Sequence, residues 1–110
     1  PIDNYRDGLA YIERVGLPLL LTADTYHLHS DQADPERAAR QMGDRLGDVH
    51  VSGSERGEPK ADNFDMDGFI RGLRAIDFQG PLIAQYHLKD VESIARVCAY
   101  VREVRERLTA

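Results

Sequence analysis

The chain has 110 residues, of which 42% are hydrophobic and 30% are charged, so its length and composition fit one globular unit. Its formal net charge of −5 disfavours nucleic-acid binding, and no apolar run reaches the roughly 18 residues of a membrane helix. The single cysteine, Cys98, excludes an internal disulfide and favours a reducing compartment. The first residues show no signal-peptide pattern, and we therefore expect a cytoplasmic protein without membrane contact.

The first half of the chain alternates helical and strand-like patterns. Residues 7–15 carry apolar side chains at helical spacing. Residues 17–23 form a short apolar run, which predicts a buried strand of a parallel sheet. A helix is predicted over 34–47, with Asp34 as its N-cap and Pro35 at its first position.

The second half repeats this alternation. A strand is predicted at 48–52, followed by a polar loop and by a helix over 65–76. A third strand is predicted at 81–86, and a long amphipathic helix at 90–108 with Asp90 as its cap. The apolar stripe of that last helix is predicted to contain Val91, Ile94, Val97, Cys98, Val101 and Val104.

The resulting order is α-β-α-β-α-β-α, with three parallel strands alternating with four helices. We expect residues 1–110 to form a single partial domain, the C-terminal part of a (β/α)8 TIM barrel. A small doubly wound sheet is the alternative. Three strands leave two sheet edges and one face without cover, so we expect further residues or another chain to complete the unit.

Polar side chains follow each predicted strand. Asp24 and His27 come after the first strand, His50 ends the second, with Arg56 in the loop beyond it, and Gln85 ends the third. Because the carboxyl ends of parallel strands meet at one rim, Asp24, His27, His50 and Gln85 are expected to converge. A carboxylate and imidazoles are suitable ligands for Mn²⁺, Zn²⁺, Fe²⁺ or Co²⁺.

Each of these residues also has a structural interpretation. An Asp-x-x-His pattern after a strand is often a helix cap. His29 and His87 fit ordinary loop or helix-entry positions. Tyr26 and Phe64 fit either stacking on a ligand or packing, and Arg56 fits either a solvated charge or a contact to a polyhydroxy ligand.

Three stretches, "ADTYHLHSD", "GDRLGDVHVSGSERGEP" and "FDMDGFIRGLRAIDFQGPLIAQ", resemble the C-terminal half of the xylose isomerase-like TIM barrels. The similarity is greatest to the sugar phosphate isomerase/epimerase group, which includes the D-tagatose and D-psicose 3-epimerases. It extends from the first residue to Leu108. Its most specific part is the combination of Asp-Thr-Tyr-His, Gly-Asp-Val-His-Val and an arginine six residues after His50.

The resemblance implies an activity and a role for each site residue. The expected activity is metal-dependent isomerisation or epimerisation of a sugar or polyol by proton transfer through an enediolate. Asp24 and His50 are expected to bind the metal ion, Mn²⁺ most readily and Zn²⁺, Mg²⁺ or Co²⁺ as alternatives. His27 and Arg56 are expected to contact the substrate. Gln85 stands where the family has a glutamate that is both a metal ligand and catalytic.

The chain departs from the family pattern at several positions. Gln85 offers an amide oxygen to a metal but cannot act as a base. The second catalytic glutamate falls one residue before Pro1, and Arg6 replaces a further glutamate. Asp48 replaces a histidine, and residues 60–63 replace a glycine-rich segment.

Two hypotheses follow. In the first, the chain is part of an enzyme, and a glutamate from outside these residues serves as the base. In the second, it is a degenerate half-barrel without catalysis that binds or assembles with a partner. Both predict a homo-oligomer or a missing N-terminal half-barrel. A third possibility, DNA repair of the endonuclease IV type, is disfavoured by the acidic charge and the few histidines.

Overall fold

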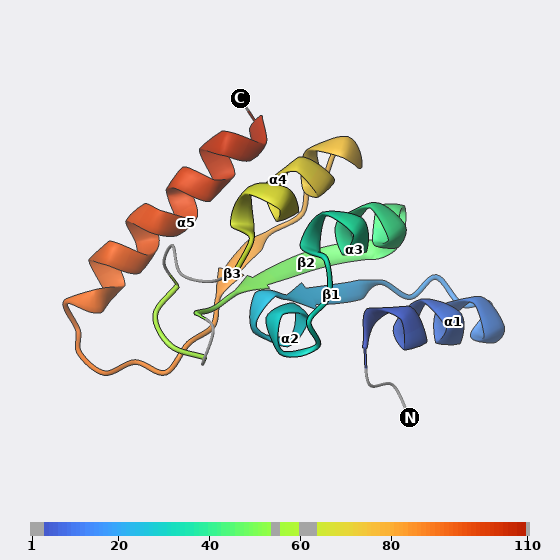
Figure 1. Cartoon of the computed structure of the whole chain (residues 1–110), viewed down its shortest axis with the longest axis horizontal. Coiled ribbons are helices and arrows are strands. Elements are labelled where there is room, and N and C mark those ends of the chain that lie inside the picture. Colours follow the sequence, from blue (N-terminus) through green and yellow to red (C-terminus); the bar gives the residue numbers. More distant parts are fainter. Residues whose placement is uncertain (1–3, 54–55, 60–63, 110) are drawn as a thin grey trace.

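The three strands form one parallel sheet, and the helices follow between them and after them (Figure 1). The structure is a computed structural model that describes residues 4–53, 56–59 and 64–109, so the segment 60–63 singled out above lies outside it. The elements are α1 (Tyr5–Val15), β1 (Leu21–Asp24), α2 (Thr25–Ser30), α3 (Pro35–Met42), the 3-10 helix η1 (Gly43–Arg45), β2 (Leu46–Val51), α4 (Met66–Ala75), β3 (Leu82–Ala84) and α5 (Ser93–Thr109). The parallel order β1-β2-β3 confirms the predicted α/β class.

The number of α-helices differs from the prediction, because five are present in the described residues and four were expected. The additional helix is α2, which begins directly after β1. Asp24 caps it, accepting hydrogen bonds at Oδ1 from the backbone N–H groups of Tyr26 (2.9 Å) and His27 (3.4 Å). Six residues are too few for a helical periodicity, so the hydrophobic pattern gave no signal for α2.

The first strand is shorter than predicted. Leu17, Leu19 and Leu20 precede β1 and are 56%, 39% and 63% exposed, so the prediction of a buried strand from residue 17 was wrong. Pro18 lacks a backbone N–H, and the N–H of Leu19 donates to the carbonyl of Leu17 (2.8 Å) in a tight turn. Pairing with β2 therefore starts only at Leu21.

The helix predicted over 34–47 is shorter than expected, because α3 ends at Met42, η1 follows it and β2 already begins at Leu46; the other elements lie near their predicted bounds. Asp34 caps α3 through a hydrogen bond from the N–H of Arg37 (3.2 Å), as predicted. The predicted apolar stripe of α5 is narrower than expected, because Val91 precedes the helix and is 74% exposed, Ile94 is 45% exposed and Cys98 is exposed as well. Asp90 accepts a hydrogen bond at Oδ1 from the N–H of Ser93 (2.8 Å), at the first residue of that helix.

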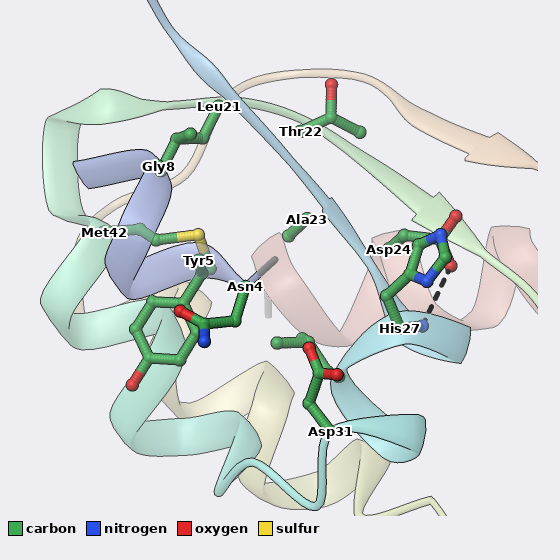
Figure 2. Close-up of a pocket in the computed structure, with 11 residues that line it drawn as sticks. Asn4, Tyr5, Gly8, Leu21, Thr22, Ala23, Asp24, His27, Asp31 and Met42 are labelled. Atoms are coloured by element: carbon green, nitrogen blue, oxygen red, sulfur yellow. Dashed lines mark hydrogen bonds between the residues drawn. The ribbon is translucent and has the colours of Figure 1, made fainter. Parts of the chain in front are cut away.

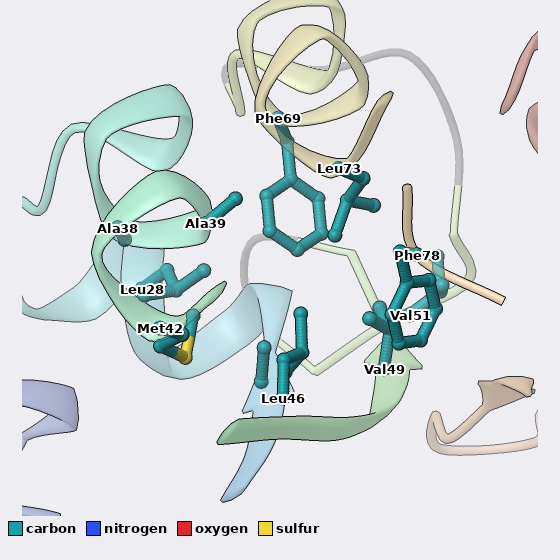
Figure 3. Close-up of a cluster of buried hydrophobic side chains, with 11 residues drawn as sticks. Leu28, Ala38, Ala39, Met42, Leu46, Val49, Val51, Phe69, Leu73 and Phe78 are labelled. Carbon is teal, nitrogen blue, oxygen red and sulfur yellow. The ribbon is translucent and has the colours of Figure 1, made fainter. Parts of the chain in front are cut away.

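The hydrophobic core lies between the sheet and the helices on one of its faces (Figure 3). Val49 and Val51 of β2 point into it, and Phe69 and Leu73 of α4 meet them. α3 and α4 approach closely at Gly72, where a Cβ atom would stand 2.7 Å from the Cβ of Ala39. This close contact fixes how the two helices cover the strands.

The opposite face of the sheet is polar and open. Thr22, Asp48, His50 and Gln85 lie on it, together with Ile83, which is 40% exposed. Strand residues alternate between faces, so the side chains beside the buried valines must point to this side. In the described part of the chain, β1 and β3 are the edges of the sheet. None of the described helices has both the length and the apolar character needed to cross a membrane.

Candidate functional site

A buried threonine joins the ends of the first two strands. Thr25 is 1% exposed; its Oγ1 donates to the carbonyl of Ser52 (3.0 Å) and accepts from the N–H of Ser52 (2.9 Å). The turns after β1 and β2 are thereby fixed to one another. Thr25 was not among the predicted site residues. Its position directly after Asp24 is the feature of the sequence that could have indicated it.

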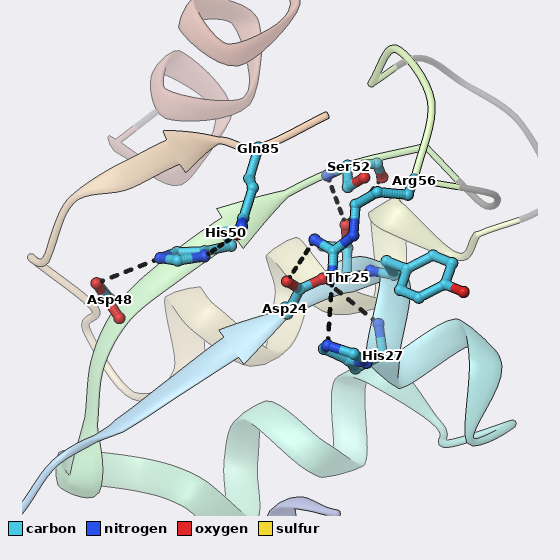
Figure 4. Close-up of polar contacts among 9 residues, drawn as sticks. Asp24, Thr25, His27, Asp48, His50, Ser52, Arg56 and Gln85 are labelled. Carbon is cyan, nitrogen blue, oxygen red and sulfur yellow. Dashed lines mark hydrogen bonds and ion pairs between the residues drawn. The ribbon is translucent and has the colours of Figure 1, made fainter. Parts of the chain in front are cut away.

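A first polar group is centred on Asp24, at the end of β1 (Figure 4). While Oδ1 caps α2, Oδ2 accepts a hydrogen bond from Nη1 of Arg56 at 2.7 Å. The two side chains are only 10% and 18% exposed, so this ion pair is shielded from water. Nη2 of Arg56 lies 3.1 Å from Nε2 of His27. The structure thus brings Asp24, His27 and Arg56 together after the ends of β1 and β2.

The position of Arg56 depends on several contacts besides this ion pair. Its backbone has a φ of 61°, a left-handed conformation that is uncommon outside glycine. Its carbonyl accepts from the N–H of His87 (2.9 Å), which ties the segment after β3 to the loop after β2. Its guanidinium stacks on the ring of Tyr26, 4.6 Å from the centroid. Tyr26 therefore packs on a cation of the same chain.

A second polar group crosses the open face of the sheet. Nδ1 of His50 lies 2.5 Å from Oε1 of Gln85, and Nε2 lies 3.7 Å from Oδ2 of Asp48. Oδ1 of Asp48 accepts from Oγ1 of Thr22 at 2.5 Å. In Figure 4 the ring of His50 stands between Asp48 and Gln85. In the sequence, Asp48 stands out only as a departure from the family pattern, and Thr22 has no signal of its own.

The group around Asp24 and the group around His50 are neighbours on the sheet. The hydrogen bonds and ion pairs described above join side chains within each group and do not connect the two groups. Asp24 pairs with His50 in the sheet register, which places both residues at matching positions of adjacent strands. Asp24 is engaged by α2 and Arg56, whereas His50 is engaged by Gln85 and Asp48. His29, for which the sequence predicted an ordinary loop position, lies in the last turn of α2.

A cavity of about 290 Å³ adjoins the first group, between α1 and β1 (Figure 2). Its walls are largely apolar, with Met42 and Ala23 among them. Asp24 and His27 lie at one end, and Asp31 is nearby. The cavity is therefore open to two of the predicted site residues.

The donors fit a divalent ion in part. Asp24 offers a carboxylate, His50 an imidazole and Gln85 an amide oxygen, all of which bind Mn²⁺ or Zn²⁺ in proteins. Arg56 already neutralises Asp24, so an ion there must compete with the guanidinium. Among the described residues, no three His, Cys, Asp or Glu side chains are grouped as a metal site. The described part of the chain thus offers a partial set of ligands.

Comparisons with known proteins agree with this fold. The chain is similar to the L-ribulose 3-epimerase of Methylomonas sp., with 36% identity over 77 residues, which are 69% of this chain and 27% of the relative. It is similar to the ketose 3-epimerase of Arthrobacter globiformis, with 32% identity over 83 residues, or 74% of this chain and 29% of the relative. The chain thus spans less than a third of these curated relatives.

Solved structures show the same relation. The D-allulose 3-epimerase from Methylomonas sp. superposes with a TM-score of 0.82 at 26% identity, over 96% of this chain and 43% of that one. The same enzyme has been solved in complex with D-allulose. The predicted kinship with part of a TIM barrel is confirmed. Residues 1–105 match the family described as "Xylose isomerase-like TIM barrel", and the chain therefore belongs to that family.

Proposed function

We propose that this chain contributes part of the active site of a divalent-metal-dependent isomerase or epimerase that acts on a ketose or a related polyol. The observation that carries this proposal is the grouping of polar side chains at the ends of β1, β2 and β3, in a chain related to 3-epimerases. Substrates of the relatives, such as L-ribulose and D-allulose, are the first candidates.

The proposed roles follow from the donor chemistry of each side chain. Asp24, His50 and Gln85 hold the metal ion, with Mn²⁺ as the first choice and Zn²⁺, Mg²⁺ or Co²⁺ as alternatives. When bound, the ion stabilises the negative charge of an enediolate. His27 and Arg56 form hydrogen bonds with substrate hydroxyl groups, and Arg56 has further N–H groups for this besides the one that it donates to Asp24.

The base for proton transfer must come from another residue. Gln85 stands where a catalytic glutamate is expected, and its amide cannot take up a proton at neutral pH. We propose that a carboxylate reaches this site from the side of the open sheet face, from the remaining part of a barrel or from a second copy of the chain. The exposed Ile83 and the edges of β1 and β3 favour such a covering partner.

Hydrogen exchange provides a direct test. The protein, purified together with the part of the barrel or the second copy that supplies the carboxylate, is incubated in D2O with Mn²⁺ and either L-ribulose or D-allulose, and deuterium at C3 is followed by NMR. We expect exchange that requires Mn²⁺ and is lost in Asp24→Asn. Asp44→Asn, which removes a carboxylate from η1, serves as the matched control and should exchange normally. Mn²⁺-dependent exchange that persists in Asp24→Asn contradicts the proposed role of that residue.

A second candidate function is a degenerate half-barrel that binds a partner without catalysis. Two observations favour it: an amide at position 85 and an arginine that already neutralises Asp24. Gln85→Glu separates the candidates, because it restores a carboxylate of similar size. Exchange that appears only in this variant indicates a degenerate site. Exchange in the unaltered protein excludes the degenerate half-barrel.

A further inference from the structure

The row formed by Thr22, Asp48, His50 and Gln85 has an arrangement of donors and acceptors that the proposed roles do not explain. The amide oxygen of Gln85 only accepts hydrogen bonds, so its 2.5 Å contact requires the hydrogen of His50 to be on Nδ1. In the neutral ring, Nε2 then has a lone pair and no hydrogen. Nε2 faces Oδ2 of Asp48, which is also an acceptor.

The distance between these two acceptors favours a shared cation. Nε2 and Oδ2 are 3.7 Å apart, which exceeds the roughly 2.7–3.2 Å of an N–H···O hydrogen bond. Two donors that each lie about 2.0–2.2 Å from one metal ion are about 3–4 Å apart, depending on the angle at the ion. The spacing of Asp48 and His50 is thus that of two ligands of one ion.

Both ligands are oriented from behind by a neighbouring side chain. Gln85 accepts from Nδ1 of His50, as backbone or side-chain oxygens do behind metal-bound histidines. Thr22 donates to Oδ1 of Asp48 at 2.5 Å, which leaves Oδ2 directed at the imidazole. Thr22 pairs with Asp48 in the register of β1 and β2, so this contact is part of the sheet itself.

Asp24, at the end of β1, and Asp48, within β2, differ in whether a cationic side chain already neutralises them. Asp24 is matched by Arg56 at 2.7 Å. In the described part of the chain, no lysine or arginine side chain pairs with Asp48, which faces the imidazole of His50. A divalent ion therefore gains more from Asp48 than from the already neutralised Asp24.

We infer that Asp48 is a metal ligand of the site, sharing a divalent cation with Nε2 of His50. Gln85, which accepts from Nδ1 on the opposite side of the ring, then positions His50, and this role replaces the direct contact with the ion proposed for Gln85 above. This inference rests on the proposed function, because it assigns one more ligand to the metal ion of that site. Asp48 is a carboxylate on the same sheet face as His50 and two residues from it. It compensates for the carboxylate that is missing at position 85.

Metal affinity tests this assignment without recourse to activity. Mn²⁺ binding to the purified protein is titrated by electron paramagnetic resonance, and folding of each variant is checked by circular dichroism. Asp48→Asn keeps the acceptor for Thr22 and removes the charge; we expect at least about tenfold weaker binding. Asp44→Asn is the matched control, with unchanged affinity, and Asp48→Glu should bind more tightly than Asp48→Asn.

The outcomes separate this inference from the proposed function. Equal affinity in Asp48→Asn and in the unaltered protein overturns the assignment of Asp48, while the proposed metal dependence stands if His50→Ala abolishes binding. An unaltered protein that binds no Mn²⁺ overturns both.

A spectroscopic measurement covers the case in which Asp48→Asn does not fold. The two ring nitrogens of His50 are observed by ¹⁵N NMR in the unaltered protein, before and after Zn²⁺ is added. We expect a hydrogen on Nδ1 in the metal-free protein and a shift of Nε2 on addition of Zn²⁺. A metal-free ring with hydrogens on both nitrogens, or a shift confined to Nδ1, overturns the inference.

Discussion

The same strands form both faces of the sheet, but one face is apolar and buried while the other is polar and partly exposed. On one face, Val49 and Val51 meet helices and are each 1% exposed. On the other, Asp48 and His50 alternate with them and are about a quarter exposed, at 29% and 26% of the side chain. Successive side chains of a strand point to opposite faces of the sheet. Each buried apolar residue of β2 is therefore next to a residue on the polar face. The difference shows that this chain carries its chemistry on the face that its own helices leave open.

We expect the largest loss of stability from a substitution in the core on the covered face of the sheet. Phe69 is 1% exposed and packs edge-to-face with Phe64 at 5.8 Å between ring centroids. Phe69→Ala removes this packing and leaves a cavity, and we expect a loss of about 3–5 kcal/mol in the free energy of unfolding. Denaturant titration measures it.

Ile83→Ala is the matched change on the open face, where the side chain is 40% exposed. We expect it to cost less than about 1 kcal/mol. A loss as large as that of Phe69→Ala is the contrary outcome, and it would show that the open face is covered in solution.

A smaller effect is expected at Thr25, which joins the segments that follow β1 and β2. Thr25→Val keeps the shape of the side chain but removes both hydrogen bonds to the backbone of Ser52. Because Thr25 is buried, we expect a loss of about 1–3 kcal/mol. Thr22→Val, on the exposed part of β1, is the control and should cost less than about 1 kcal/mol. Thermal unfolding of the pair checks this order; equal losses would contradict it.

Removal of the guanidinium beside Asp24 tests whether the ion pair of Asp24 with Arg56 competes with metal binding. Arg56→Met frees the carboxylate of Asp24 for a metal ion, so we expect Mn²⁺ to bind several-fold more tightly, which corresponds to about 1 kcal/mol. The same change should raise KM for the sugar if Arg56 contacts it. Arg40→Met, which breaks a surface pair with Glu36, is the control. Unchanged Mn²⁺ affinity in Arg56→Met would show that the ion pair does not compete.

The smallest expected effect concerns pH and the outer surface of the helices. Arg71 of α4 and Arg40 of α3 hydrogen-bond to Glu36 and hold the pKa of its carboxyl below the ordinary value. A carboxyl whose pKa is lower in the folded state stabilises the protein above its unfolded pKa, and this stability is lost as the pH falls through the folded pKa. Glu36→Gln should therefore lose less stability on acidification than the unaltered protein.

Melting temperatures measured from neutral to acidic pH test this expectation. Asp44→Asn controls for the loss of one surface carboxylate. Because Glu36 is at the surface, we expect the difference between the two curves to be small and to vanish at high salt. Parallel curves for Glu36→Gln and the unaltered protein at low salt would contradict the role of the ion pairs.

The sequence by itself determined most of the helices, the parallel strands and the positions of Asp24, His50 and Gln85 at strand ends. These are local properties: helical spacing in α4, the cap at Asp34 and short apolar runs each show in a few consecutive residues. It failed where local signals conflict or are too short, as in the exposed leucines before β1 and in α2.

The tertiary structure decided which polar groups meet. The pairing of Asp24 with Arg56 joins residues 32 positions apart, and the contact of His50 with Gln85 joins residues 35 apart. The contact of Thr22 with Asp48 likewise depends on the register between β1 and β2, which shifts by one residue between Leu21 and Thr22. Spacing along one strand cannot reveal a register between strands, because a slip of one residue changes which face each side chain occupies. For that reason Asp48 and Thr22 emerged only from the folded sheet.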